Sequence, residues 1–275
     1  MSDAIKIQNL TKTYGKHRGV QDISFAVEEG DIFGFLGPNG AGKSTTIRSM
    51  LGMIHYQAGE ISLLGKNVKT SQKEILLQVG YMPSEAMFYS AMKVKDVIRF
   101  AADARKMNCE KEAEAICKRL EVDTEKRIEE LSLGNRKKVS IVCAMQHKPK
   151  LLILDEPTSG LDPLMQEAFF DLILEYNRQG TTCFLSSHVL PEVKRYCKNA
   201  AVIRDGKIIA SDTVENLSKS NARRVKLVQH GKLDEFVYTG NMNELILKLQ
   251  GAEIEDLLIE EPSLDEVFMH FYEKQ

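Results

Sequence analysis

The chain has 275 residues, which is enough for one large domain or two small ones. Apolar residues make up 43% and charged residues 28%, a balance that is typical of globular proteins and excludes intrinsic disorder. The 37 basic and 39 acidic residues give a net charge of -2, without the basic excess of a nucleic-acid-binding protein, so we expect no nucleic-acid partner.

The sequence also lacks the features of a membrane-spanning or secreted chain. No run approaches the roughly 18 apolar residues that cross a bilayer. The first residues, MSDAIKIQNL, have neither the basic nor the apolar region of a signal peptide, so we expect the chain to stay in the cytosol. The five cysteines form no CxxC pair, which predicts reduced core residues rather than disulfides or a zinc site.

The first elements in chain order are predicted strands. Apolar residues alternate over 5–10, 20–30 and 31–37, with a turn at Gly30-Asp31. After Gly37 the pattern changes to a helix that begins near Lys43.

A phosphate-binding loop lies between this last strand and the helix. Residues 37–44 read GPNGAGKS and match GxxxxGK[ST], in which glycines let backbone N–H groups surround phosphates. Lys43 supplies a cation for the outer phosphates and Ser44 an oxygen for Mg²⁺, while the helix N-terminus adds positive charge. The predicted nucleotide contacts are Gly37, Pro38, Asn39, Gly40, Ala41, Gly42, Lys43, Ser44 and Thr45.

Helical spacing between Val94 and Leu120 predicts a helical insert, which we place at about residues 86–147. A second helix is expected past Arg136. It leads to the apolar run 151–154, which is typical of a strand buried on both faces of a parallel sheet.

Two adjacent acids end that strand, at the edge where open α/β sheets bind ligands. We expect Asp155 to hold Mg²⁺ through water and Glu156 to polarise the water that attacks the γ-phosphate. An Asp-Glu pair after a strand is by itself often an ordinary surface feature. The phosphate-binding loop upstream favours the catalytic interpretation.

The remaining core elements complete an α/β alternation. A helix from Pro163 to about Arg178 and a strand over 181–187 precede a hairpin over 201–210, with a type I′ turn at Asp205-Gly206. From residue 211 the charge changes, because 211–275 has 7 basic and 13 acidic residues. We therefore predict a domain over 1–210 and a C-terminal accessory region over 211–275.

The C-terminal region predicts strands over 225–230 and 234–240. Capping boxes at 241–244 and 263–266 each predict the start of a helix, and the second helix has an apolar face. That face comprises Leu264, Val267, Phe268 and Phe271. We expect a small α+β module that packs on the core or on a twin subunit, rather than a ligand-binding site.

With these motifs in place, the whole chain resembles the nucleotide-binding subunit of an ATP-binding cassette (ABC) transporter. The sequence LSLGN at 131–135 stands where that family has its LSGGQ signature, and it keeps Ser132 and Gly134 while Leu133 and Asn135 differ. The resemblance implies an α/β fold. Its parts are a P-loop NTPase core of the ABC cassette type, an antiparallel β subdomain, the helical insert and the α+β appendage.

The resemblance also implies roles for residues whose own sequence context is weak. The segment 159–162 matches the D-loop that passes between the two sites of a dimer, and His188 matches the switch histidine that contacts the γ-phosphate. Tyr14 matches the aromatic residue on which adenine stacks. Without the resemblance, Tyr14 reads as a strand-edge aromatic and a lone histidine as structural.

One family feature is missing. The glutamine loop falls at 79–83, where no glutamine occurs, and Ser84 and Glu85 follow. Glu85 has the reach that Ser84 lacks, so we hypothesise that Glu85 replaces the glutamine as a metal ligand; the alternative is a solvated loop charge. The apolar cluster at 87–89 is either buried within the insert or a docking surface for a partner's helix.

The resemblance implies an ATPase subunit that uses ATP and Mg²⁺ and dimerises head to tail, as a homodimer or with a paralogue. It implies separate integral-membrane permease subunits, at the cytoplasmic face of the cell membrane. The tail at 261–268 resembles that of ABC-2 exporters. One alternative is a soluble ABC ATPase acting on ribosomes or DNA, and such proteins have two cassettes or long heptad insertions. Another is a non-hydrolysing binder, which would be expected to lose Lys43 or Glu156; both are present.

Overall fold

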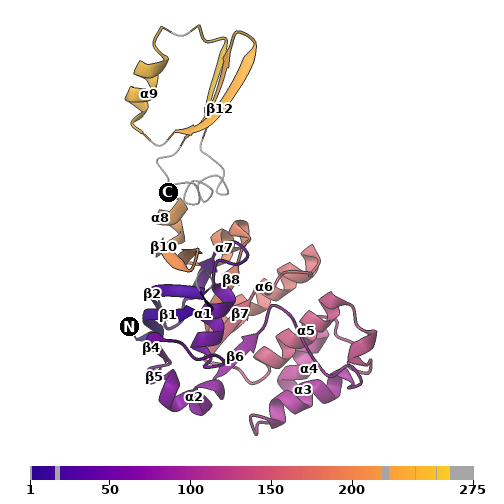
Figure 1. The fold of residues 1–275 in the computed structure, drawn as a ribbon. Coiled ribbons are helices and arrows are strands. Elements are labelled where there is room, and N and C mark those ends of the chain that lie inside the picture. Colours follow the sequence, from indigo (N-terminus) through magenta and orange to yellow (C-terminus); the bar gives the residue numbers. More distant parts are fainter. Residues whose placement is uncertain (1, 16–18, 219–222, 239, 252, 261–275) are drawn as a thin grey trace. The chain divides into compact units, whose positions relative to one another are not determined.

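A computed structural model describes residues 2–15, 19–218, 223–238, 240–251 and 253–260 (Figure 1). The chain divides into two compact units, residues 1–211 and 212–275, and each is described by itself. Among the described residues, no helix has the length and apolar character needed to cross a membrane.

A six-stranded sheet forms the centre of the first unit, in the order β10-β9-β3-β8-β7-β6. Neighbouring strands from β9 to β6 run parallel. Strands β3, β7 and β8 are buried along their whole length, which is why their sequences are almost continuously apolar. The strands are β3 (Ile32–Leu36), β6 (Val79–Met82), β7 (Leu151–Asp155), β8 (Thr182–Ser187), β9 (Asn199–Arg204) and β10 (Lys207–Thr213).

The register of this sheet brings the site together. Leu36 at the end of β3 pairs with Ser187, and Asp155 at the end of β7 pairs with Ser186. The loops that leave β3, β7 and β8 therefore start side by side at the carboxyl edge of the sheet.

A second, antiparallel sheet has the order β2-β1-β4-β5. Its inner face shares one apolar core with the parallel sheet. The ring of Phe25 on β2 stacks on Phe33 and Phe184, with centroids 5.7 and 5.9 Å apart. The elements are β1 (Asp3–Thr13), β2 (Gly19–Glu28), β4 (Ala58–Leu63) and β5 (Lys66–Asn67), with the helices α1 (Lys43–Met50) and α2 (Val68–Leu76).

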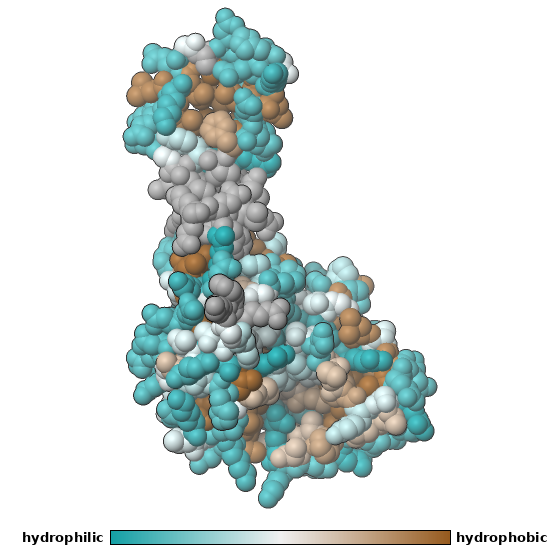
Figure 2. All heavy atoms as spheres, in the orientation of Figure 1, coloured by the Kyte–Doolittle hydropathy of each residue, from teal (hydrophilic) through white to brown (hydrophobic). Residues whose placement is uncertain are grey.

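The helical insert consists of α3 (Val94–Asp103), α4 (Glu110–Arg119), the 3₁₀ turn η1 (Ile128–Glu130) and α5 (Leu133–Met145). The helix α5 begins at Leu133, three residues before Arg136 and thus earlier than expected, because Ser132 caps it. Apolar side chains reach the surface among charged ones over this insert (Figure 2). Two further helices, α6 (Pro163–Arg178) and α7 (Leu190–Tyr196), follow β7 and β8.

The second unit is a small α+β module with a three-stranded sheet in the order β12-β11-β13. Its elements are α8 (Val214–Ser218), β11 (Arg223–Gln229), β12 (Lys232–Tyr238), α9 (Met242–Leu249) and β13 (Asp256–Glu260). Asn241 caps α9 as the sequence predicted, whereas β13 was not predicted. The helix predicted from Ser263 and the tail at 261–268 lie outside the described residues.

Candidate nucleotide-binding site

The loop between β3 and α1 has a backbone that only small residues permit. Gly42 has a φ of 112°, and a Cβ there would lie 2.6 Å from the Val20 side chain. A Cβ on Gly37 would lie 2.4 Å from the carbonyl oxygen of Ile203. Gly42 is also the N-cap of α1, so the free N–H groups of the first turn of α1 adjoin the loop.

This loop lines a cavity of about 590 Å³. The pocket is rich in backbone and polar groups, as a phosphate site requires. A larger cavity of about 860 Å³ lies between α3 and α4, but neither the loop nor the paired acids line it. The residues around the smaller cavity are Tyr14, Gly19, Pro38, Asn39, Gly40, Gly42, Lys43, Ser44, Thr45, Ser84 and Glu156. Gly37 and Ala41 are buried behind them.

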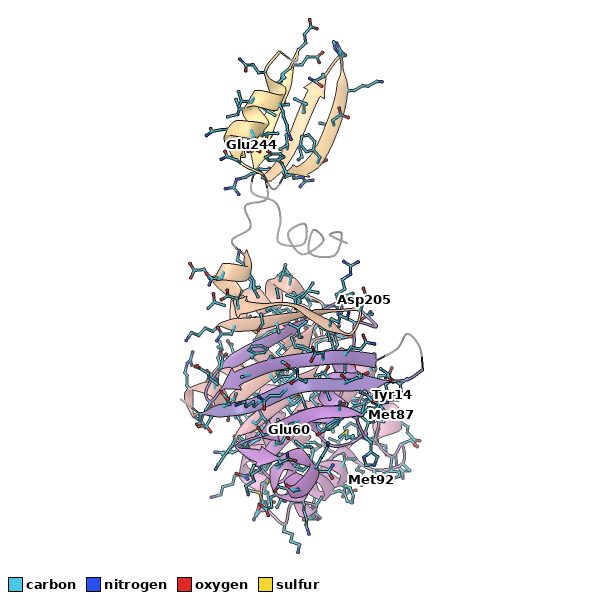
Figure 3. The ribbon with its side chains drawn as sticks, turned by 60° about the vertical axis from the view of Figure 1, so that its left-hand side comes forward. Tyr14, Glu60, Met87, Met92, Asp205 and Glu244 are labelled. Atoms are coloured by element: carbon cyan, nitrogen blue, oxygen red, sulfur yellow. The ribbon has the colours of Figure 1, made fainter. Side chains whose placement is uncertain are left out.

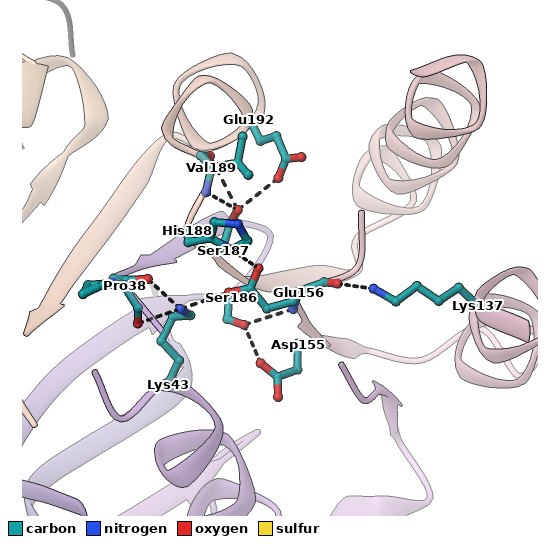
Figure 4. Close-up of polar contacts among 11 residues, drawn as sticks. Pro38, Lys43, Lys137, Asp155, Glu156, Ser186, Ser187, His188, Val189 and Glu192 are labelled. Carbon is teal, nitrogen blue, oxygen red and sulfur yellow. Dashed lines mark hydrogen bonds and ion pairs between the residues drawn. The ribbon is translucent and has the colours of Figure 1, made fainter. Parts of the chain in front are cut away.

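Three predicted catalytic residues are in contact beside this cavity: Lys43 and Glu156 line it, and His188 reaches Glu156 (Figure 4). The Lys43 Nζ lies 2.9 Å from Glu156 Oε1, and His188 Nδ1 lies 2.7 Å from Glu156 Oε2. Lys43 also donates to the carbonyl oxygens of Gly37, at 2.5 Å, and Pro38, at 3.2 Å. The Lys43 and Glu156 side chains are only 6% and 14% exposed, so their ion pair is shielded from water. A phosphate that binds Lys43 must compete with this carboxylate.

Asp155 is 1% exposed and accepts a hydrogen bond from Ser186 Oγ at 2.7 Å. Within the described ranges no cationic side chain forms an ion pair with this buried carboxylate, and its hydrogen-bond donor is a neutral hydroxyl. A divalent cation would complete it. No cluster of three or more His, Cys, Asp or Glu side chains suited to a metal occurs in the described part of the chain.

The signature residues lie outside this chain's own cavity. Ser132 is exposed, and its Oγ accepts the N–H of Asn135 at 3.3 Å as the N-cap of α5. Gly134 packs against the D-loop, because a Cβ there would lie 2.8 Å from the carbonyl oxygen of Gly160. A glycine at 134 is thus required sterically, and the N-terminus of α5 faces outward.

Tyr14 follows β1 at the edge of the cavity and is 49% exposed (Figure 3). The Lys12 Nζ lies 4.6 Å from the centroid of its ring. Because about half of the residue is exposed, the ring can also stack with a planar group such as a nucleotide base.

The structure does not bring Glu85 to the site. Glu85 is exposed, whereas Ser84 lines the cavity. The reason is local: β6 ends at Met82 and the chain bends at Ser84 and Glu85, so the two neighbouring side chains face different surroundings. The residue that takes the glutamine's place at the cavity is the shorter of the two.

Lys137 is a neighbour of the site that sequence reasoning missed. Its Nζ donates to the carbonyl oxygen of Glu156 at 2.6 Å, and the residue is 1% exposed. A signal was present in the sequence: Lys137 lies four residues before Ile141 and therefore on the apolar face of α5. A charge at such a position indicates a specific buried partner.

Comparisons with known proteins identify the family. The family model for the ABC transporter matches residues 20–159. The ABC transporter ATP-binding protein MJ1023 of Methanocaldococcus jannaschii is 34% identical over 275 residues, covering 95% of this chain and 100% of the relative. This chain is an ATP-binding subunit of the ABC transporter family. The bacitracin transport ATP-binding protein BcrA of Bacillus licheniformis is 34% identical to this ABC subunit, with coverages of 98% and 86%.

Solved structures agree on the fold. An ATP-binding subunit of an ABC transporter superposes with a TM-score of 0.76 at 26% identity, covering 98% of this chain and 100% of that one. The cassette MJ0796, solved as a dimer with ADP and Pi, gives a TM-score of 0.70 over 76% of this chain and 98% of its own, but at 20% identity it supports the fold alone. The predicted fold class, ATP binding and ATPase activity are confirmed. A soluble ABC ATPase acting on a non-membrane target is not favoured.

Proposed function

We propose that this ABC ATPase works as a head-to-tail pair of cassettes that drives export through separate membrane subunits. The observation that supports the proposal is the contact of Glu156 with both Lys43 and His188, at the cavity that Lys43 and Glu156 line. A cation, a carboxylate and a histidine side by side are the groups that a γ-phosphate and its attacking water would need.

Under this proposal, each residue of the site has a defined role in binding or hydrolysing ATP. The loop N–H groups and Lys43 bind the phosphates, and Ser44 with Asp155 holds Mg²⁺, whose charge would offset that of the phosphate oxygens. Glu156 accepts a proton from the attacking water, and His188 contacts the γ-phosphate. Glu85 is exposed and outside the cavity, so we assign it no part in the metal site.

ATP binding requires the site to rearrange. Because Lys43 is paired with Glu156, the incoming phosphates must displace the Glu156 carboxylate from Lys43. Several charge-assisted hydrogen bonds from the loop and Lys43 offset the loss of this one pair. The carboxylate released from Lys43 remains beside His188, next to the γ-phosphate.

The outward position of the signature supports a site shared by two chains. Ser132 and Leu133 at the start of α5 are exposed, and neither lines this chain's cavity. Free N–H groups at a helix start attract phosphate. In a head-to-tail pair, they would close over the nucleotide held by the other chain, which is a second copy or a paralogue.

The loop after β6 supports a membrane partner. Met87 is 86% exposed and Tyr89 is 76% exposed, so of the two interpretations of this apolar cluster we propose the docking surface (Figure 3). Such a surface suits a helix of a membrane subunit, which would hold the ATPase at the cytoplasmic face. BcrA is named for bacitracin transport and LnrL of Bacillus subtilis for linearmycin resistance, which supports an exporter of the ABC-2 type.

Lys43→Ala tests the nucleotide site. We expect the ATP dissociation constant, measured by calorimetry, to rise tenfold or more, about the effect of losing a charge-assisted hydrogen bond. The control Lys66→Ala removes a lysine that pairs with Glu74 on the surface, and it should bind ATP like the parent. Unchanged affinity in Lys43→Ala contradicts the assignment.

The membrane partner is tested by isolating the tagged protein from detergent-solubilised membranes. We expect a protein with several membrane-spanning helices to co-purify with the parent and to be lost with Met87→Asp. Leu233→Asp, which changes a 60% exposed residue of the second unit, is the control. Recovery of the same soluble partners from the parent and both variants, without a membrane protein, contradicts the proposal.

A further inference from the structure

Lys137 is a buried cation that contacts the backbone of Glu156, the proposed catalytic residue. It lies on α5, five residues after the signature serine, Ser132. Its Nζ donates to the backbone carbonyl oxygen of Glu156 at 2.6 Å, and only 1% of the residue is exposed (Figure 4). Burying an ammonium group is costly unless its partners compensate, so this contact calls for a specific role.

The surroundings of Lys137 carry opposite charge. Burial lowers the pKa of Lys137 below its ordinary value, and the nearby carboxylates of Glu156, Asp155 and Glu192 offset part of that shift. These carboxylates favour the charged form, which makes the hydrogen bond to the carbonyl oxygen stronger than one from a neutral donor.

The bond acts on a residue with an unusual backbone. Glu156 has a φ of 51°, in the left-handed region that non-glycine residues seldom adopt. Its N–H is held by the carbonyl and hydroxyl oxygens of Ser186, each at 3.2 Å, and its carbonyl by Lys137. Both peptide groups of Glu156 are thus held, which fixes the direction in which its carboxylate leaves the backbone.

We propose that Lys137 is a positioning residue that holds Glu156 in the left-handed conformation from which its carboxylate reaches the γ-phosphate. The inference rests on the proposed catalytic role of Glu156. A positioning contact of this kind contributes to turnover because small displacements of a base raise the barrier.

The contact also belongs to the signature helix. Gly134 and Lys137 are three residues apart on α5 and face the segment from Glu156 to Gly160. The helix start proposed to bind the partner's nucleotide and the lysine that holds this chain's own Glu156 are therefore parts of one rigid element.

The first test compares Lys137→Met, Lys137→Gln and the control Lys138→Met, which removes the next lysine of the same helix. Methionine fills the buried space without a donor, and glutamine keeps a neutral one. We expect Lys137→Met to lower kcat about tenfold or more while the ATP dissociation constant stays within about twofold. Lys137→Gln should recover part of kcat, and Lys138→Met should match the parent. Thermal unfolding of each variant separates a folding defect from a catalytic one.

The second test repeats Lys137→Met in the Glu156→Gln background by single-turnover hydrolysis. If Lys137 acts through Glu156, the second change should cost less than twofold there. An equal loss in both backgrounds, or parent-like kcat in Lys137→Met, overturns the inference. If Lys137→Met fails to fold, the same comparison with Lys137→Gln decides. Full activity of Glu156→Gln alone would instead overturn the role proposed for Glu156.

Discussion

At the scale of single residues, the site contains an ion pair between Lys43 and Glu156 that ATP would have to break in order to bind Lys43. Lys43 and Glu156 are both largely buried, so removing one partner would leave an uncompensated charge. In the proposed site, a triphosphate would offer Lys43 several oxygens in exchange and would leave Glu156 free beside His188. Under that proposal, the residue that competes with ATP for Lys43 is also the one released next to the γ-phosphate.

The loop after β6 makes a sharp prediction about metal dependence. Ser84 lines the cavity and Glu85 is exposed, so we expect Ser84→Ala to raise the Mg²⁺ concentration for half-maximal hydrolysis about threefold or more, the effect of losing one hydrogen bond. Glu85→Ala, the matched control, should titrate like the parent. A shift confined to Glu85→Ala would show that the loop rearranges and would restore the original hypothesis for Glu85.

At the scale of elements, the sequence predicted those with strong local signals. Three sequence patterns each suit a single local structure: the glycines of the phosphate loop, the apolar run before Asp155 and the turn at Asp205-Gly206. Asp205 and Gly206 both have positive φ, as a type I′ turn requires. Two elements differed from the prediction. The strand β13 was not predicted, and it forms by pairing with β11. The start of α5 was placed too late, because the signature interpretation of Ser132 was preferred to the helix cap that Ser132 forms.

The neighbour of the site that the sequence did not predict, Lys137, depends on a contact between distant parts of the chain. The position of Lys137 on the apolar face of α5 indicates a buried partner, but no local pattern identifies that partner as Glu156, which lies 19 residues away in the chain. Glu85 was favoured over Ser84 because of its reach and because a carboxylate suits Mg²⁺, whereas the bend after β6 decides which of them faces the cavity.

His147, which follows α5, provides a test of how the insert is joined to the central sheet. Its Nε2 lies 3.2 Å from the carbonyl oxygen of Val79 at the start of β6, and the residue is 5% exposed. Burial, reinforced by the charge of Arg105, lowers the pKa of His147 to about 4 from an ordinary value of 6.5. The folded chain therefore keeps the imidazole neutral, with Nε2–H as the donor to Val79.

The neutral, buried His147 makes the stability of the folded chain depend on pH. Between pH 6.5 and about 4 the unfolded chain binds a proton at His147 that the folded chain does not, so stability from this residue is complete above pH 6.5 and is lost as pH falls. We expect His147→Gln to reduce the loss of unfolding free energy between pH 8 and pH 5 by about 2 kcal/mol. His55→Gln changes an exposed histidine of the same unit and serves as the control in chemical denaturation. Parallel curves for parent and His147→Gln would contradict this account.

At the scale of the whole molecule, the proposed head-to-tail pair would complete the nucleotide site of each chain. Lys43 and Glu156 line the cavity, while Ser132 lies on the surface outside it. Hydrolysis in a head-to-tail pair requires each chain to supply the phosphate loop to one site and the signature to the other. Damage to the two motifs should therefore be complementary between chains.

Mixing Lys43→Ala with Ser132→Arg tests this arrangement. Each variant alone has two damaged sites, whereas a mixed pair has one site with both changes and one with neither. Random mixing should restore about a quarter of the parent's sites, measured by single-turnover hydrolysis. Circular dichroism checks that loss of the Ser132 cap leaves the fold intact. No recovery, once mixed pairs are demonstrated by differential tagging, contradicts the shared site.

The central claim is that Glu156 drives hydrolysis of ATP bound in the phosphate-loop cavity. Its most direct test measures ATP binding and steady-state turnover on the same preparation of Glu156→Gln. We expect turnover to fall about a hundredfold or more, the scale of a lost general base. ATP affinity should be equal or higher, because the carboxylate that pairs with Lys43 is gone. An ATP-stabilised dimer should then appear on size exclusion. Turnover close to the parent's, with ATP bound equally well, would contradict the account.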